Sequence, residues 1–209
     1  MQRRTVLSIV FISILILGGL IIWKEYSDSQ ARTKEQPQKI SRQTFEKKRQ
    51  PNRRALNQQL FINASQNQNG NTAALGRRLL ENIKYKQINL VDYHIHQIGQ
   101  VSANKDQFNV VFKNMKSSKN IIIGTPVYWS DMSGYLKTLF DRMGEHEDGS
   151  LRGKNVYLVI QGSDPSDAII PITHVVKHLS DTFQMNFIGE ATTDEQVANL
   201  HDKLFQNSR

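Results

Sequence analysis

Short apolar runs alternate with helix-patterned stretches from about residue 58 to the C-terminus. The runs lie at residues 60–62, 88–91, 121–124, 156–160 and 186–189. Runs of this length, bounded by polar and turn-forming residues, are typical of strands that are buried on both faces. After each run, apolar residues recur at spacings of three and four, which indicates an amphipathic helix. The clearest helical stripe is formed by Phe108, Val111, Phe112 and Met115.

This alternation predicts an α/β domain built on a doubly wound, five-stranded parallel sheet with helices on both faces. We expect the domain to occupy residues 55–209, with right-handed crossovers between the strands. The pattern by itself does not choose between the two strand orders that are common in open α/β sheets. Ligands of such sheets bind outside the carboxyl ends of the strands, so the loops at that edge are the candidate site.

The first 24 residues have a different pattern, which predicts a single transmembrane anchor. Residues 5–23 are almost wholly apolar, and about 20 such residues are enough to span a bilayer as a helix. A cleaved signal peptide is the alternative, but residues 21–26 do not provide the small residues of a cleavage site. An uncleaved membrane anchor is therefore favoured. Basic residues lie on both flanks of the span, so the side of the membrane that holds the domain is left open.

Residues 25–54 form a polar linker that is rich in Gln, Lys and Arg. Its composition favours a solvated tether. Binding of its basic residues to anionic lipid headgroups is a second interpretation, if the linker is cytoplasmic. Nucleic-acid binding is disfavoured, because no aromatic residues interleave with the basic ones.

Composition excludes several kinds of site in this chain of 209 residues. The chain has no cysteine and a formal net charge of +8. Disulfides, Cys-ligated zinc and Cys-ligated iron–sulfur clusters are therefore excluded, whereas the cellular compartment is left open. His174 and His178 lie one helical turn apart, but no carboxylate completes a zinc motif, and we do not expect a metal site.

The loop after the first apolar run is polar and precedes a predicted helix, as an anion site requires. Backbone N–H groups and the positive end of the helix would point toward an anion bound there. The loop is neither a Walker loop nor the Gly-x-Gly-x-x-Gly turn of dinucleotide-binding folds. A simple helix cap by Asn71 or Thr72 is the alternative interpretation. The candidate binding residues in this loop are Ser65, Asn67, Asn69, Gly70, Asn71 and Thr72.

The loop after the third run carries two adjacent aromatic residues. We expect Thr125 and Pro126 to end the strand, which would leave Val127, Tyr128 and Trp129 at the surface. Aromatic faces in that position can stack on a planar ring, and nearby amides can bond its polar edge, although burial in the core is the commoner fate of aromatics. The candidate ring-binding residues are Pro126, Val127, Tyr128 and Trp129.

A third loop, after the fourth run, contains Gly162 and Ser163, which permit close approach of the backbone to a ligand. A plain turn before a helix explains the same residues about as well. Taken together, the three loops suggest a site for a flat, aromatic and phosphorylated ligand.

The order of these motifs resembles the flavodoxin-like NAD(P)H-dependent FMN reductase superfamily. The resemblance covers residues 58–205 and is carried by the polar loop at 65–72, by Thr-Pro-Val-Tyr-Trp at 125–129 and by Met-Ser-Gly at 132–134, followed by Leu-Lys and Phe-Asp-Arg. The branch of multimeric flavodoxin quinone reductases and iron–sulfur flavoproteins is the most similar. The cysteine cluster of the iron–sulfur proteins is absent, because residues 94–100 contain no cysteine. Family members often carry Arg where this chain has Asn67.

The resemblance implies the strand order 2-1-3-4-5 and bound FMN, with its phosphate in the first loop. It also implies a flavin ring against residues 126–129, completed by Gly162 and Ser163, and NAD(P)H as electron donor. Homodimers are common in the superfamily, and we expect one here.

We therefore expect a membrane-tethered oxidoreductase that passes electrons through FMN to a small acceptor such as a quinone, a flavin, an azo or nitro compound or a ferric complex. No catalytic side chain is required, because the flavin carries the chemistry. Two alternatives are a flavodoxin-type electron carrier without NAD(P)H activity and a non-enzymatic module that has lost FMN.

Overall fold

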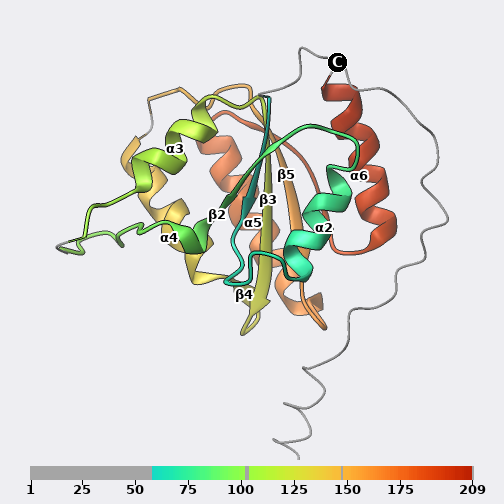
Figure 1. The fold of residues 1–209 in the computed structure, drawn as a ribbon, viewed down its shortest axis with the longest axis horizontal. Helices are drawn as coiled ribbons and strands as arrows, with labels where there is room; N and C mark the ends of the chain where they lie inside the picture. Colours follow the sequence, from blue (N-terminus) through green and yellow to red (C-terminus); the bar gives the residue numbers. More distant parts are fainter. Residues whose placement is uncertain (1–57, 102–103, 147, 209) are drawn as a thin grey trace, which may run out of the picture. The chain divides into compact units, whose positions relative to one another are not determined.

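A parallel sheet lies at the centre of the computed structural model, which describes residues 58–101, 104–146 and 148–208 (Figure 1). The parallel strands follow the spatial order β2-β1-β3-β5-β6. Since β4 is a short antiparallel addition to β3, this order is the predicted 2-1-3-4-5, and that prediction is confirmed. The strands are β1 Gln59–Asn63, β2 Lys86–Asn89, β3 Asn120–Tyr128, β4 Asp131–Met132, β5 Asn155–Gln161 and β6 Asn186–Ala191.

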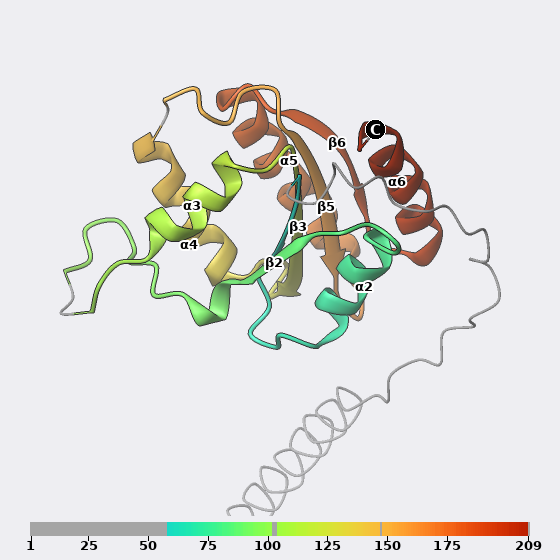
Figure 2. The ribbon, with the colours of Figure 1, turned by 45° about the horizontal axis from the view of Figure 1, so that its top comes forward.

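Helices cover both faces of the sheet, as the alternating pattern predicts. Helices α2 and α6 lie on one face, and α3, α4 and α5 lie on the other (Figures 1 and 2). The α-helices are α2 Asn71–Leu79, α3 Phe108–Lys116, α4 Gly134–Met143, α5 Ser166–Thr182 and α6 Asp194–Asn207. Two short 3-10 helices, η2 Leu90–Asp92 and η3 Gly144–His146, follow β2 and α4.

Each face of the sheet has its own hydrophobic core. Neighbouring residues of a strand point to opposite faces, so Leu60 and Ile62 pack toward α3, α4 and α5, whereas Phe61 packs toward α2 and α6. All three side chains are fully buried. Burial of one such side chain contributes about 1.5–3 kcal/mol, so the sheet is held from both sides.

Two glycines bring α2 close to the sheet. A Cβ atom at Gly76 would lie 2.2 Å from Cζ of Phe61, and one at Gly124 would lie 2.9 Å from Cε2 of the same ring. The ring therefore fills the space between the helix and β3. A Cβ atom at Gly124 would also lie 3.1 Å from Cγ2 of Thr72, in the first turn of α2. The start of α2 is thus held directly against the carboxyl half of β3.

A row of amide side chains crosses the amino ends of four strands. Asn186 Nδ2 donates to Asn155 Oδ1 (3.1 Å), and Asn155 Nδ2 donates to Asn120 Oδ1 (2.8 Å). Asn120 Nδ2 then donates to Gln59 Oε1 (2.6 Å), and Gln59 Nε2 donates to Ser208 Oγ (2.8 Å) at the end of α6. The four amides occupy paired positions of adjacent strands. We call this row the amide ladder.

The predicted membrane anchor at residues 1–24 and the linker at 25–54 lie outside the described residues. Within residues 58–101, 104–146 and 148–208, no helix combines the length and apolar character that a membrane span requires.

Candidate active site

Three loops gather at the carboxyl edge of the sheet, at the lower end of the molecule in Figure 1. They follow β1, β3 and β5, and together with the start of α2 and the end of β3 they contain every residue that the sequence singled out for binding. Thr72, next to Gly124, brings the first loop against β3. A Cβ atom at Gly162 would lie 3.2 Å from Cβ of Val127, so the third loop packs against the second. The prediction that these loops share one edge is confirmed.

The first loop is shaped by its own side chains. Asn63 Oδ1, Ser65 Oγ and Asn67 Oδ1 each accept a hydrogen bond from the N–H two residues further along, at 3.2, 3.0 and 3.1 Å. Such local bonds fix an otherwise irregular turn. Ser65 is buried, whereas Asn67 and Asn69 are exposed. The amide group of Asn67 and the hydroxyl proton of Ser65 can still donate to a ligand.

The amino end of α2 is open toward the same space. Gly70 is the N-cap residue and provides no side-chain cap, so the alternative of a cap by Asn71 or Thr72 is wrong. The hydrogen bonds of the described residues include no acceptor for the N–H groups of Asn71, Thr72 and Ala73. Gly70 has a φ of −75°, so it does not adopt a left-handed conformation. A Cβ atom at this position would crowd the Asn67 side chain, and this close packing explains the glycine.

The second loop is a β-hairpin, which corrects the prediction that the strand ends at Thr125 and Pro126. Strand β3 continues to Tyr128, and Pro126 still pairs with Gln161 of β5. Proline has no backbone N–H, and the sheet tolerates Pro126 because the pairing between β1 and β3 ends at Gly124, two residues earlier. The chain reverses at Trp129 and Ser130, which have φ angles of 50° and 61°. Positive φ at both central residues is the geometry of a type I′ turn.

The two aromatic residues are at the surface, as predicted. Trp129 is fully exposed, and Tyr128 is 41% exposed. Val127 is half-buried and Pro126 is buried, so the base of the hairpin is packed while its tip projects. Both aromatic rings therefore have faces that a planar ligand can contact.

Hydrogen bonds hold both ends of the hairpin. Ser130 Oγ donates to Asp167 in the first turn of α5. At the base, the Ser133 N–H donates to Thr125 Oγ1 (3.1 Å), and Ser133 Oγ caps α4 by accepting from the Leu136 N–H (3.3 Å). These hydrogen bonds give the hydroxyl groups of Thr125 and Ser133 a structural role at the base of the hairpin. The sequence does not predict the hydrogen bond between Ser130 and Asp167, because the two residues are 37 positions apart and form no motif.

The third loop begins with Gly162 and leads directly into α5. Gly162 is half-buried beside Val127, whereas Ser163 is exposed. Asp164 Oδ1 accepts from both the N–H (3.3 Å) and the hydroxyl (2.7 Å) of Ser166. These hydrogen bonds from Ser166 lower the pKa of Asp164 below its ordinary value.

Downstream residues of the motif serve the scaffold. Arg142 Nη1 donates to Asp106 Oδ2 (2.6 Å) and to the His96 carbonyl (2.9 Å), and its Nε donates to Glu145 (2.7 Å). Burial would raise the pKa of Asp106, but hydrogen bonds from the Phe108 N–H and from Arg142 outweigh it, and the pKa is lowered. Arg142 therefore links His96 and Asp106, on either side of residues 102–103, to α4.

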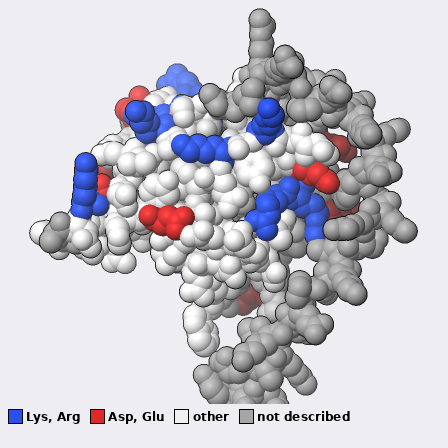
Figure 3. Space-filling view, in the orientation of Figure 1, with Lys and Arg blue, Asp and Glu red and all other residues white. Residues whose placement is uncertain are grey.

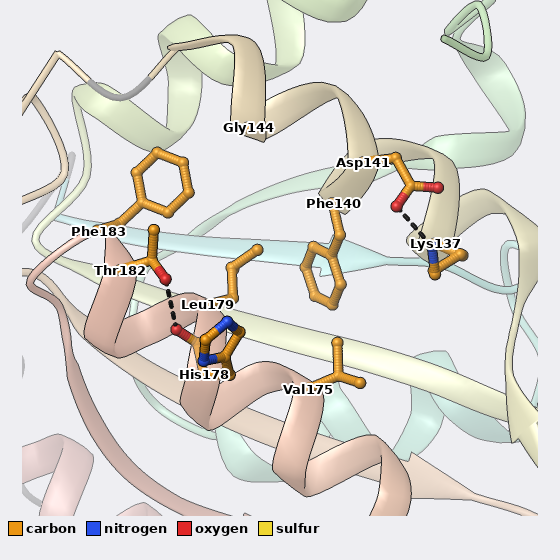
Figure 4. A pocket seen from close by; sticks show the side chains of 9 residues that line it. All are labelled: Lys137, Phe140, Asp141, Gly144, Val175, His178, Leu179, Thr182 and Phe183. Atoms are coloured by element: carbon orange, nitrogen blue, oxygen red, sulfur yellow. Dashed lines mark hydrogen bonds and ion pairs between the residues drawn. The ribbon is translucent and has the colours of Figure 1, made fainter.

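A separate groove of about 210 Å³ lies between α4 and α5, away from the three loops (Figure 4). It is mainly apolar, with the ion pair of Lys137 and Asp141 at one side. His178 lines the groove, whereas His174 does not. Among the described residues, no group of three His, Asp or Glu side chains is arranged to hold a metal ion.

The fold defines a flavodoxin-like α/β protein, and its three loops form a candidate ligand site at the carboxyl edge of the sheet. The chain belongs to the NADPH-dependent FMN reductase family, whose model matches residues 58–198. This is a family of NAD(P)H-dependent, FMN-containing oxidoreductases.

Individual relatives are distant. YwqN of Bacillus subtilis strain 168, whose name describes a candidate NAD(P)H-dependent FMN-containing oxidoreductase, is 24% identical over 168 residues, which are 71% of this chain and 93% of YwqN. The Trp repressor binding protein from Bacillus subtilis has a TM-score of 0.53 at 21% identity, covering 73% of this chain and 98% of its own. The apo form of the NADH:FMN oxidoreductase EMOB has a TM-score of 0.51 at 17% identity, covering 72% and 88%. These structures support the fold.

Proposed function

We propose that this chain binds FMN at the three loops, accepts electrons from NAD(P)H and passes them to a small acceptor such as a quinone, a flavin, an azo or nitro compound or a ferric complex. The observation that carries the proposal is the open amino end of α2 beside an exposed aromatic hairpin. This pairing offers N–H donors for a phosphate and ring faces for a flavin within one site.

The phosphate half of the site consists of neutral donors. The N–H groups of Asn71, Thr72 and Ala73, in the first turn of α2, have no acceptor among the described residues. A helix amino end stabilises an anion by about 0.3–1 kcal/mol in exposed sites. The hydroxyls of Ser65 and Thr72 and the amide of Asn67 add donors. No Lys or Arg lies between residues 64 and 76, so this half binds through hydrogen bonds rather than ion pairs.

The ring half of the site consists of the hairpin and the third loop. Tyr128 and Trp129 offer aromatic faces, and Gly162, packed beside Val127 of the hairpin, places the backbone of the third loop next to them. Bound FMN would supply the redox chemistry, and this chain's own residues bind and orient it. No described side chain is needed as a general acid or base.

We also propose a membrane tether through residues 1–24 and a homodimer. The tether is supported by the apolar run at residues 5–23 and the basic residues that flank it. The homodimer is supported by the resemblance to superfamily members that dimerise.

The decisive experiment is a visible absorption spectrum of the full-length chain in detergent, before and after anaerobic addition of NADH or NADPH. Flavin bands that bleach with either donor would support the proposal. Bands that persist with both donors would favour an electron carrier. A colourless chain that cannot be reconstituted with FMN would contradict FMN binding altogether.

A matched pair of variants tests the phosphate half. Thr72→Val keeps the methyl group that packs against Gly124 but removes the hydroxyl, so we expect FMN to bind about tenfold more weakly. Thr173→Val is the control, because the Thr173 hydroxyl is buried in α5 and has no hydrogen-bond partner among the described residues. Fluorescence titration with FMN measures both. Equal affinities in the two variants would show that the Thr72 hydroxyl does not contact the ligand.

A further inference from the structure

The three loops of the proposed site carry carboxylates and no basic side chain. Residues 64–73, 126–135 and 161–168 contain no Lys or Arg. They do contain Asp131, Asp164 and Asp167, and Asp92 joins them from the segment after β2. In Figure 3, the projecting lower end of the molecule, which carries the hairpin, shows none of the blue basic side chains.

Hydrogen bonds tie each of these carboxylates to the site. Asp92 accepts from Gln68 in the first loop and from Asn89 (3.3 Å). Asp167 accepts from Ser130 at the tip of the hairpin.

The other two carboxylates belong to the loops themselves. Asp131 pairs with Tyr128 across the hairpin and accepts from the Met132 N–H (2.7 Å). Asp164 follows Ser163 in the third loop and accepts from Ser166. Asp131, Asp164 and Asp167 therefore lie on the hairpin, in the third loop and at the start of α5, and Asp92 adjoins the first loop.

Every donor to these carboxylates in the described part of the chain is a neutral group, so no ion pair offsets their negative charge there. The ion pairs of the described residues involve other acids, namely Asp106, Asp141, Glu145, Asp148 and Asp194. Arg142 is paired with Asp106 and Glu145, and Lys137, two residues beyond the second loop, is paired with Asp141. A ligand group that approaches the hairpin or the third loop therefore meets negative charge that no cation of the described residues offsets, whereas the amino end of α2 favours an anion.

We propose that this site favours NADH over NADPH, because Asp92, Asp131, Asp164 and Asp167 repel the 2′-phosphate of NADPH. The inference rests on the proposed function. Both dinucleotides give up the same hydride and leave in the oxidised form, so the chemical step does not distinguish them. They differ by one phosphate, which adds a charge of about −1.5 to −2 at neutral pH. This member would then differ from the cofactor preference in the description of its family.

The ionic strength of the solution gives a direct test on the unmodified chain. The screening length is about 30 Å at 0.01 M salt and about 3 Å at 1 M. We expect the second-order rate constant for flavin reduction, measured by anaerobic stopped flow, to be about tenfold or more higher with NADH than with NADPH at low salt. The ratio should fall toward one at high salt, because screening removes the repulsion.

Charge-removing variants locate the effect. Asp164→Asn combined with Asp167→Asn keeps the size of both side chains and an oxygen that can accept from Ser130. We expect this double variant to raise the rate constant for NADPH about threefold to tenfold, with much less change for NADH. Asp181→Asn, an exposed position near the far end of α5, is the matched control and should leave the ratio unchanged.

The outcomes separate the two proposals. A chain that holds FMN and is reduced equally well, or better, by NADPH at low salt would overturn the inference and leave the proposed function standing. A ratio that does not respond to salt would also overturn it. A chain without flavin would remove the proposed function, and the inference with it.

Discussion

Phe61 shows how a single residue sets the position of a helix relative to the sheet. Its ring occupies the space between α2 and β3, and Gly76 and Gly124 are the positions that leave room for it. Because α2 carries the proposed phosphate-binding end, the packing of this ring also determines where that end lies.

Replacement of Gly76 by Ala should therefore destabilise the fold. The new Cβ atom would lie 2.2 Å from the Phe61 ring, and overpacking of this kind costs about 1–3 kcal/mol. The gain in helix propensity, about 1 kcal/mol, offsets only part of this cost. Chemical denaturation of the variant and its parent measures the difference.

Gly134→Ala is the control for this prediction. Gly134 is the first residue of α4, and a Cβ atom there would have no neighbour within 4 Å. The same change should be neutral or stabilise the chain by about 0.4–1 kcal/mol. Equal stability of the two variants would contradict the role assigned to Phe61.

Trp129 and Ser130 mark the limit of prediction from sequence at this scale. Type I′ turns usually carry Asn-Gly or Asp-Gly, residues that tolerate positive φ. A Trp-Ser pair does not have this composition, so the sequence does not predict the hairpin. Thr125 and Pro126 instead indicate that the strand ends early. The exposure of Tyr128 and Trp129 was nevertheless predicted correctly, because a loop at the end of a buried strand is at the surface.

At the level of elements, Arg142 of α4 links His96 and Asp106, which lie between β2 and α3, to its own helix. This side chain joins Asp106, the His96 carbonyl and Glu145, and it lies 5.0 Å above the ring of Phe108. The sequence indicated Arg142 as part of a family motif, but its role depends on residues that are far away in the chain. Periodicity predicted α3 itself well, since Phe108, Val111, Phe112 and Met115 are all buried.

Arg142→Met should lower the free energy of unfolding by roughly 1–3 kcal/mol at neutral pH, because Asp106 would lose its charged partner. The effect should shrink in acid. The pKa of Asp106 is lowered in the fold, so its contribution is complete above its unfolded pKa of about 3.9 and is lost as the pH falls through the lower folded value.

Urea denaturation of both proteins across the acid range, from neutral pH to below pH 4, measures this loss. Arg152→Met is the control, because Arg152 is exposed and has no ion pair among the described residues. A difference between Arg142→Met and its parent that is constant over the whole range would exclude Asp106 as the titrating group.

For the whole molecule, the charge is divided sharply along the sequence. Residues 1–57 hold 12 of the 27 Lys and Arg residues and 4 of the 19 Asp and Glu residues, so they account for the entire net charge of +8. Residues 58–209 hold 15 of each kind and are neutral overall. The basic character of the chain therefore belongs to the proposed anchor and linker, and it implies nothing about the ligand of the folded domain.

Removal of residues 1–54 should release the protein from membranes, because the apolar run at residues 5–23 would be lost. A second deletion, of residues 25–54 alone, keeps that run but removes the basic linker. We expect the full chain and the second deletion to stay in the membrane fraction after a high-salt wash, and the first deletion to be soluble. Release of the full chain by salt alone would favour electrostatic binding to lipid headgroups over a spanning helix.

The sequence predicted the class of fold and the family correctly because both depend on patterns that are local in the chain. Strand order came from the resemblance, since the alternation of strands and helices allows more than one order. The branch within the superfamily, the orientation in the membrane and the assignment of individual flavin-binding residues stay predictions, because none of them follows from the fold alone.

The amide ladder has a consequence for how the chain finds its strand order. Every amide in it donates in the same direction, from Asn186 to Ser208, so each bond exists only if the next strand is the correct neighbour in the correct register. A sheet that slipped by one residue, or that exchanged two strands, would leave the amides of Asn120 and Gln59 buried without partners, each at a cost of about 1–3 kcal/mol. Compact states with an incorrect strand order or register are thereby higher in free energy, which widens the energy gap between them and the native sheet. The amide ladder, at the edge of the sheet opposite the candidate active site, thus disfavours incorrect strand orders and registers.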